Sequence, residues 1–431
     1  MKMKNQANQN NQGSNNIPQL RFPEFTGEWE KKKLGEVAEI SSGGTPSRTN
    51  RTYWNGEIPW VSTTLIDFNF IDKTEEYITE ERLKNSSAKL LPKGTLLMAM
   101  YGQGKTRGKI SILNIEASTN QACGAIITNN EVLNSLFAFQ NLAKRYDEIR
   151  DLSNQGGEEN FSGSIIKGIE ISFPTLTEQT KIATFLTAVD EKIQALKKKY
   201  SLLEVYKKGV MQRLFCLHHD SPDLHDEYDL RDGKQEKNQG NQENHKKSRF
   251  RQLRFKDENG NDFPDWEVKK LGEVCEKQSS NISANKIEEN FGNYIIYGAA
   301  GVLKKVDFYE VEEDYISIVK NGAGVGRLLF CKGKSSVLGT LDIIKPIGKI
   351  NTYFLYCLLS NIDFSKYTTG STIPHIYFKD YKNEDIILPC LEEQTLIANF
   401  LSDLDEKINV QTRLIASLEQ WKKGLLQKMF V

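Results

Sequence analysis

The chain has 431 residues, and its 57 basic and 57 acidic side chains leave no net charge. This length exceeds one ordinary hydrophobic core, and the content of 38% hydrophobic and 26% charged residues is that of a globular protein with two or three domains. Zero net charge excludes DNA binding through bulk charge alone, so a DNA site would need basic residues gathered on one face or supplied by a partner.

The cysteines and the hydropathy pattern predict a cellular compartment. No apolar run approaches the ~20 residues that span a bilayer, and no signal-peptide core follows the start. The six cysteines have no CxxC or CxxxC spacing, which argues against a zinc site and for a reducing compartment. We therefore expect a cytoplasmic protein with no metal site.

The chain begins with two contrasting segments. Residues 1–18 are rich in Asn and Gln and poor in apolar side chains, which predicts a disordered tail. A block at 19–39, which starts QLRF and ends near KKLGEVAE, returns with a small insertion at 252–277. Trp29 aligns with Trp266, so this block is an internal repeat.

Residues 19–173 are predicted to form the first globular domain. Within its body, 40–173, strand-like runs precede a helical stretch near 131–150, which is typical of a mixed α/β domain with more β than α. The strand-like runs are 58–61, 94–100, 110–115 and 123–127.

One stretch of this body, AMYGQGKT at 99–106, nearly matches a phosphate-binding P-loop centred on Lys105. A P-loop must lead from a strand into a helix, because the helix N-terminus supplies part of the anion site. The following residues, RGKISILNIEAS, instead predict a second strand. We therefore favour a β-hairpin whose Lys105, Arg107 and Lys109 suit contact with DNA, and the P-loop remains the alternative.

Residues 174–215 predict a long helix, and 389–431 repeat it without a gap. Apolar side chains recur at steps of four and three over three heptads, the pattern of a coiled-coil seam. The two seams are predicted to pack on each other. The seam residues are Ile182, Leu186, Val189, Ile193, Leu196, Leu203, Ile397, Leu401, Leu404, Ile408, Ile415 and Leu418, with Gln411 in one polar slot. Gly209 and Gly424, in matching KKG triplets, suggest a close backbone contact, a kink or a loosened last turn.

Between the two halves, residues 216–250 are polar and are predicted to be a linker. Its histidines 218, 219 and 225 lie among acids, and a solvated linker is the better interpretation than a metal site. Residues 251–388 predict a second mixed α/β domain, with strand-like runs at 294–297, 315–319, 328–330 and 341–344 and a helical stretch near 351–361. The bodies at 40–173 and 278–388 share almost no identity. This is the pattern of one scaffold that carries two different readers.

Candidate DNA-reading residues follow from side-chain chemistry. Asn and Gln pair well with adenine, Arg and Lys with guanine, and Ser or Thr with several base edges. The alternative is that these side chains cap turns or carry solvated charges. The candidates are Thr45, Arg48, Ser62, Thr63, Gln103, Lys105, Arg107, Lys109, Asn120, Gln121, Tyr297, Lys320, Asn321, Arg327, Thr372 and His375.

No motif for catalysis is present: there is no HExxH, no GxSxG, no methyltransferase tetrapeptide and no acidic cluster with a Lys like that of a nuclease core. We expect a chain that is not itself an enzyme.

The repeated framework closely resembles the specificity subunit of type I restriction-modification enzymes. The residues that carry the resemblance are LGEVAEISSGGTPSRTNRTYWNGEIPWVSTTLID, FPTLTEQTKIATFLTAVDEKI and KKGVMQRLF in the first half, with GSTIPHI, LPCLEEQTLIANFLSDLDEKI and KKGLLQKMF in the second. The pattern EQ…IA…FL…D…I at fixed spacing, found twice, is specific, and the resemblance runs from about residue 19 to the end.

The resemblance implies that each body is a target-recognition domain for one half of a split DNA sequence, and that the two helices pack antiparallel as a spacer with a pseudo-twofold repeat. It also implies that two methyltransferase subunits with S-adenosylmethionine, and restriction subunits with ATP and magnesium, dock on the framework, with none of these cofactors on this chain. A helix of this length measures about 60 Å, enough to separate two readers by a DNA turn of ~34 Å or more. A specificity subunit of another multisubunit defence system remains a second alternative.

Overall fold

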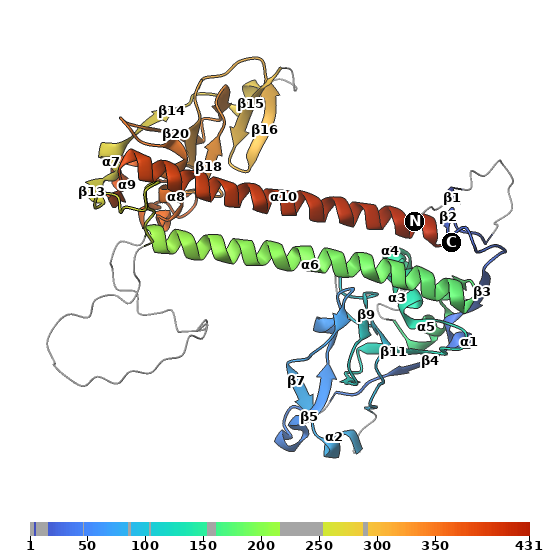
Figure 1. Ribbon diagram of the computed structural model, residues 1–431. Coiled ribbons are helices and arrows are strands. Elements are labelled where there is room, and N and C mark those ends of the chain that lie inside the picture. Colours follow the sequence, from blue (N-terminus) through green and yellow to red (C-terminus); the bar gives the residue numbers. More distant parts are fainter. Residues whose placement is uncertain are drawn as a thin grey trace. The chain divides into compact units, whose positions relative to one another are not determined.

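The computed structural model describes residues 4–5, 16–45, 47–84, 88–102, 105–152, 161–215, 253–287 and 292–431. The predicted linker with its histidines, most of the predicted tail and the candidate Gln103 lie outside these residues. The chain divides into two compact units, Met1–Lys197 with Arg413–Val431 and Lys198–Thr412. Each unit thus contains one body together with part of both long helices (Figure 1).

The first unit is built on a five-stranded sheet in the order β4 (Ala38–Ser42), β11 (Cys123–Thr128), β8 (Leu96–Ala99), β9 (Ile110–Leu113), β6 (Phe70–Ile71). A three-stranded sheet has the order β10 (Ser118–Thr119), β5 (Trp54–Val61), β7 (Glu76–Ile78). Two smaller pairs join β3 (Glu30–Lys33) to β12 (Glu170–Phe173) and β1 (Lys4–Asn5) to β2 (Leu20–Arg21). The helices are α1 (Leu34–Val37), α2 (Glu80–Lys84), α3 (Ser135–Lys144), α4 (Tyr146–Leu152) and α5 (Gly163–Gly168), with 3₁₀ turns η1 (Arg51–Tyr53) and η2 (Thr63–Leu65).

The five-stranded sheet separates two hydrophobic cores, because successive side chains of a strand point to opposite faces. In β8, Leu96 and Met98 lie in the core that includes α3 and the long helices. Leu97 and Ala99 lie in the second core, beside Val61 at the end of β5. Both faces are covered, so the strand is apolar at every position and shows no alternation with polar residues.

The second unit repeats this architecture. A four-stranded antiparallel sheet has the order β14 (Cys275–Ser279), β20 (Leu341–Pro346), β17 (Tyr315–Val319), β18 (Leu328–Cys331). A three-stranded sheet has the order β16 (Gly301–Val306), β15 (Tyr294–Gly298), β19 (Ser335–Val337), and β13 (Glu267–Lys270) pairs with β21 (Asp385–Leu388). The remaining elements are α7 (Leu271–Val274), α8 (Thr352–Ser360), α9 (Phe378–Tyr381), η3 (Ala284–Lys286) and η4 (Phe364–Tyr367). Two bodies without evident sequence identity therefore share one fold.

The long helices α6 (Leu176–Phe215) and α10 (Leu391–Met429) pack antiparallel. In the first unit Lys422 forms an ion pair with Asp190, and in the second unit Lys207 forms one with Asp405. These residues occupy matching positions of the two repeats, so the same cross-helix pair is made once in each unit. A further pair joins Lys197 to Glu419 at 2.7 Å in the first unit.

The predicted seam residues are mostly buried. Buried are Ile182, Leu186, Val189, Ile193, Leu196, Ile397, Leu401, Leu404 and Ile408, and half-buried are Leu203, Ile415 and Leu418. Gln411 in the polar slot is buried, and its Oε1 has no hydrogen-bond partner among the described residues. At Gly209 and Gly424 a Cβ atom would meet nothing within 4 Å, so the close backbone contact that the repeat suggested is absent at both.

The Gln of each EQ pair joins a long helix to the body beside it. Gln179 Oε1 accepts a hydrogen bond at 2.8 Å from the backbone N–H of Asn134, the residue that caps α3. Gln394 Oε1 accepts one at 3.0 Å from Asn351, the residue that caps α8. Their Nε2 groups donate to the backbone oxygens of Pro174 and Pro389. The amide therefore fixes the start of the short helix against the start of the long one.

The Glu of each EQ pair is a buried carboxylate with an arginine partner. Arg21 donates from Nε and Nη2 to Glu178, both at 2.7 Å. Arg254 donates to Glu393 at 2.9 and 3.0 Å. The hydrogen bonds to Glu393 raise the pKa of Arg254 above its ordinary value. Arginine suits this role because its planar fork bonds both carboxylate oxygens at once.

The aligned tryptophans differ in their hydrogen bonding, and this predicts a difference in stability. Trp266 Nε1 donates to Glu393 Oε2 at 2.9 Å, whereas Trp29 Nε1 is buried without a partner among the described residues. Both Trp→Phe changes remove an indole, but only Trp266→Phe takes a donor from a buried charge. We expect Trp266→Phe to cost about 1–3 kcal/mol more free energy of unfolding than Trp29→Phe.

Denaturant unfolding of the two variants, with hydrogen exchange to locate the loss within each unit, measures this difference. Equal losses, or a larger loss for Trp29→Phe, would contradict the assignment of the indole hydrogen bond.

Candidate nucleic-acid interface

In the first unit, the strand order brings several predicted residues to one end of the five-stranded sheet. β4 ends there at Ser42 and β8 at Ala99, and β11 begins there at Cys123, which pairs with Ala99. The loops attached to these strand ends hold the candidates Thr45, Arg48, Lys105, Arg107, Lys109, Asn120 and Gln121. Direct contacts join the loops: Gly44 N donates to Thr119 O at 2.8 Å, and the Thr45 hydroxyl donates to Gln121 Oε1.

The Arg48 guanidinium lies over two aromatic rings. Its guanidinium carbon lies 4.1 Å from the Trp54 ring centroid and 5.5 Å from that of Trp60. Glu76 accepts two hydrogen bonds from it, which raises the pKa of Arg48. The Arg48 side chain remains 61% exposed. The group is therefore a permanently charged, oriented donor at the surface, which contact with a guanine edge or a phosphate requires.

Beside this end of the five-stranded sheet lie Ser62, Thr63 and Asn120. Asn120 N donates to Val61 O at 3.1 Å, which places the Asn120 loop next to Ser62. The Ser62 and Thr64 hydroxyls are 2.6 Å apart. Asn120 Oδ1 accepts from Ala122 N at 3.1 Å, so this oxygen caps its own turn.

The β8–β9 hairpin carries the three basic candidates of the first body. Gly108 N donates to Ala99 O and Ala99 N to Lys109 O, both at 2.9 Å. The loop is followed by strand β9 and not by a helix. The structure therefore gives no support to the P-loop alternative. Lys105 is exposed and Arg107 is half-buried. Lys109 pairs with Asp67 at 2.6 Å.

The second unit repeats the hairpin. Gly326 N donates to Val319 O at 2.8 Å and Val319 N to Arg327 O at 2.9 Å, the bonds that Gly108 and Lys109 make with Ala99 in the first unit. Gly108 has φ +83° and Gly326 has φ +82°, the left-handed region that glycine favours. The predicted equivalence of the two Gly-rich loops therefore extends to their backbone geometry.

In the second unit, hydrogen bonds and an ion pair link the charged and polar side chains at the base of the β17–β18 hairpin. Lys320 Nζ is 2.9 Å from Asp342 Oδ1, and Ser279 Oγ donates to the same oxygen at 2.9 Å. Arg327 Nη1 donates to Ala299 O at 3.1 Å. The base of the β17–β18 hairpin is thus anchored to β14 and β20.

A second loop, between η4 and α9, lies against this hairpin. Ile376 N donates to Lys320 O at 3.0 Å, and His375 Nδ1 lies 2.9 Å from Asn321 Oδ1. Thr372 is exposed on this loop. Tyr297 does not join the edge: it is 8% exposed, lies in the core beside Tyr315 and accepts at its hydroxyl from Lys332 N at 3.4 Å.

The sequence did not predict the acidic partners of the basic candidates. Glu76, Asp67 and Asp342 hold Arg48, Lys109 and Lys320, yet each is at least 22 residues from its partner. No local motif marks them, because the strand topology alone decides which acid meets which base.

Among the described residues, few other sites suit chemistry. Burial raises the pKa of the Cys123, Cys275 and Cys357 thiols to about 12 and that of Cys331 to about 11, so these sulfurs carry protons at neutral pH. Within the described ranges no group of three or more His, Cys, Asp or Glu could hold a metal ion, and every helix there is too short or too polar to span a bilayer.

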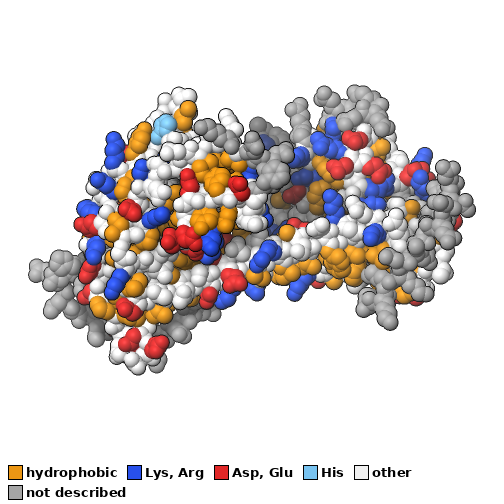
Figure 2. Space-filling view, turned by 90° about the horizontal axis from the view of Figure 1, so that it is seen from above, with side chains coloured by type: hydrophobic (Ala, Val, Ile, Leu, Met, Phe, Trp, Pro, Cys, Tyr) orange, Lys and Arg blue, Asp and Glu red, His pale blue; other side chains and the backbone are white. Residues whose placement is uncertain are grey.

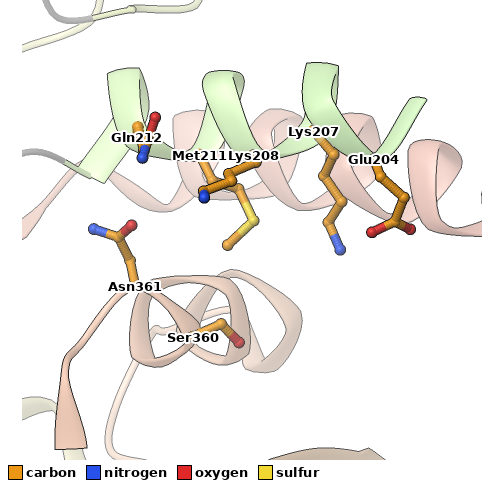
Figure 3. Close-up of a pocket in the computed structure, with 7 residues that line it drawn as sticks. All are labelled: Glu204, Lys207, Lys208, Met211, Gln212, Ser360 and Asn361. Atoms are coloured by element: carbon orange, nitrogen blue, oxygen red, sulfur yellow. The ribbon is translucent and has the colours of Figure 1, made fainter. Parts of the chain in front are cut away.

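One recess lies in the second unit, away from the hairpins. It has a volume of about 370 Å³ between α6 and the end of α8 (Figure 3). Its lining is mostly polar, and Lys207 in it is already paired with Asp405. The lining residues are Glu204, Lys207, Lys208, Met211, Gln212, Ser360 and Asn361.

The surface charge is mixed. On the face seen in Figure 2, Lys and Arg side chains are interspersed with Asp and Glu and do not form one continuous basic surface. This agrees with the zero net charge of the chain and favours recognition by individual side chains together with basic surface from a partner.

Comparison with known proteins identifies the family. A family model described as "Type I restriction modification DNA specificity domain" matches residues 26–205 and 264–420. The chain belongs to this family. Each match covers one body and a large part of the long helix that follows it, so the chain contains two copies of the specificity domain.

Individual relatives and a solved structure are consistent with this family. The chain is 26% identical over 435 residues to the type I restriction enzyme MjaIX specificity subunit of Methanocaldococcus jannaschii, covering 93% of this chain and 92% of the relative. It is 30% identical over 176 residues to the EcoR124I/EcoR124II specificity subunit of Escherichia coli, covering 40% of this chain and 43% of that one. The crystal structure of a type I restriction-modification S subunit from M. genitalium matches with a TM-score of 0.65 at 17% identity, over 96% of this chain and 99% of that chain.

Proposed function

We propose that this chain is the DNA-specificity subunit of a type I restriction-modification system and binds a split DNA target through its two bodies. One observation carries the proposal: two bodies of the same fold present the same hairpin edge with different side chains. Arg48, Lys105 and Gln121 line the first edge, and Asn321, Arg327 and His375 line the second. A shared frame with different readers suits two unlike half-sites.

The candidate residues then divide into two roles. Exposed Lys105 and half-buried Arg107 suit phosphate contacts, which position a protein on DNA without reading sequence. Arg48 and Gln121 can form the paired hydrogen bonds that distinguish bases. In this proposal the chain recognises DNA and its partner subunits carry out the chemistry.

We also propose that two methyltransferase subunits dock on the repeated framework, because a pseudo-twofold repeat offers the same surface twice. In the first unit Phe22, Phe185 and Trp421 form a row of rings with centroids 6.0 and 6.2 Å apart, and Trp421 is 49% exposed. In the second unit Phe255 packs on Phe400, and Tyr206, at the position of Trp421 in the repeat, is 53% exposed. Exposed aromatic side chains are enriched at protein interfaces.

Restriction subunits would join the same complex, and the whole would act in the cytoplasm. S-adenosylmethionine, ATP and magnesium would be bound by the partner subunits and not by this chain.

Methylome sequencing tests the proposal. The chain is produced with its methyltransferase partners in a host that lacks other adenine methylation. We expect one split motif to become methylated, and no motif when the chain is omitted. A complete complex that methylates no split motif would contradict the proposal.

Exchange and insertion variants separate the roles of bodies and helices. Replacing residues 40–173 with the body of a relative should change only the first half of the motif. Adding one heptad to both α6 and α10, about 10 Å of helix, should change the tolerated gap and leave both halves unchanged.

A further inference from the structure

The second unit holds one aromatic ring that two loops fix in place. His375 lies between η4 and α9, and Asn321 lies in the β17–β18 hairpin. The His375 Nδ1 and Asn321 Oδ1 atoms are 2.9 Å apart, although 54 residues separate them in sequence. Backbone bridges also pair His375 with Asn321 and with Thr369. The imidazole is therefore positioned by contacts that its own loop could not make alone.

The Asn321 contact decides the tautomer of the ring. An amide oxygen only accepts hydrogen bonds. His375 Nδ1 therefore carries the proton and donates a hydrogen bond to Asn321 Oδ1. In a neutral imidazole the other nitrogen is then an acceptor. Among the described residues no group donates to His375 Nε2, which leaves this atom available to a ligand.

A glycine lies beside that edge of the ring. Gly370 has φ +90°, and a Cβ there would lie 3.3 Å from His375 Cδ2, the carbon bonded to Nε2. The Tyr377 ring lies near parallel to the imidazole, at 22° with centroids 6.4 Å apart. Ile373 and Tyr377 are 56% and 50% exposed. The ring is thus half-buried and oriented, with an unpaired acceptor beside a glycine.

We propose that His375 reads one base pair of the second half-site, with Nε2 accepting a hydrogen bond from the exocyclic amino group of adenine or cytosine in the major groove. This inference rests on the proposed function. Adenine N6 and cytosine N4 are the major-groove donors, whereas guanine presents N7 and O6 and thymine presents O4, all acceptors. An acceptor fixed by Asn321 therefore selects the amino-bearing bases at its position.

Binding of the complete complex to synthetic duplexes tests this proposal. The wild-type motif is determined first, and its second half-site is then rebuilt with single base analogues that lack the amino group: purine for adenine and 2-pyrimidinone for cytosine. At one position the analogue should weaken wild-type binding about 10-fold, the magnitude typical of one good base contact. His375→Ala should weaken binding to the natural duplex by a similar factor and should lose nothing further with the analogue.

Two variants of Asn321 provide the matched control. Asn321→Asp keeps an oxygen acceptor for Nδ1–H and should keep the base preference, whereas Asn321→Leu should lose it at the same position. The proposal is overturned if His375→Ala and the analogue weaken binding independently, or if His375→Ala affects both half-sites equally. A wild-type complex that binds no split motif would instead refute the proposed function, so the two failures are distinguishable.

Discussion

Replacing Arg21 with alanine should lower the free energy of unfolding of the first unit by about 3–5 kcal/mol, because the buried Glu178 carboxylate would lose its charged partner. The Glu178 side chain is 1% exposed, and among the described residues Arg21 is its only hydrogen-bond donor.

The second unit supplies a graded comparison. Arg254→Ala also removes the arginine, but Glu393 keeps hydrogen bonds from Phe255 N at 3.2 Å and Trp266 Nε1 at 2.9 Å. We therefore expect a smaller loss for Arg254→Ala than for Arg21→Ala. Lys181→Ala is the control for losing an exposed pair on the same helix: Lys181 and Glu24 are 37% and 44% exposed, and such pairs contribute about 0–1 kcal/mol.

Denaturant unfolding combined with hydrogen exchange measures these effects, since a loss of this size should raise exchange in the affected unit by at least about 100-fold. A loss below that of Lys181→Ala, or one that appears in the wrong unit, would contradict the structural role of Arg21.

Replacing Phe430 with alanine should destabilise the first unit by about 3–5 kcal/mol, although this residue is next to last in the chain. Phe430 is 3% exposed, and its ring centroid lies 6.3 Å from that of Trp29 and 5.1 Å from that of Phe137. The residue that follows α10 thus completes a core formed by the first body, and the truncated side chain would leave a cavity there.

A symmetrical variant and a neighbouring residue serve as controls. Phe215, at the matching position of α6, packs on Phe354 with centroids 5.6 Å apart, so Phe215→Ala should destabilise the second unit instead. Deleting Val431, which is 41% exposed, should change the free energy of unfolding by less than about 0.5 kcal/mol. Hydrogen exchange again locates the loss, and increased exchange in the second unit of Phe430→Ala would refute this packing.

Much of the secondary structure could be predicted locally. The predicted strand-like run at 315–319 coincides with β17, and that at 123–127 falls within β11. Helix α8 lies inside the predicted 351–361 stretch, whereas the stretch near 131–150 forms two helices, α3 and α4, that divide at Arg145. Hydrophobic period and turn residues are local signals, so they locate elements well and their ends less well.

The candidate site could be predicted only as a set of residue types. The Gly-rich hairpins were recognisable because glycine and basic residues cluster within a few positions. The contacts of Arg48 with Glu76 and of Asn321 with His375 were not recognisable, because each joins two segments that only the sheet topology brings together. Tyr297 shows the opposite case: this aromatic candidate lies in strand β15, next to a Gly-rich turn, and belongs to the core.

The sequence by itself determined that the chain is a tandem repeat with two long helices, because heptad spacing and an ungapped duplication need no tertiary information. Only the tertiary structure decided that the two dissimilar bodies have one fold, and that each unit contains the start of one long helix and the end of the other. The physical reason is that a core is specified by apolar volume and strand order, which many sequences satisfy. The partners of Glu178, Gln179 and Phe430 lie far along the chain and are chosen by packing alone.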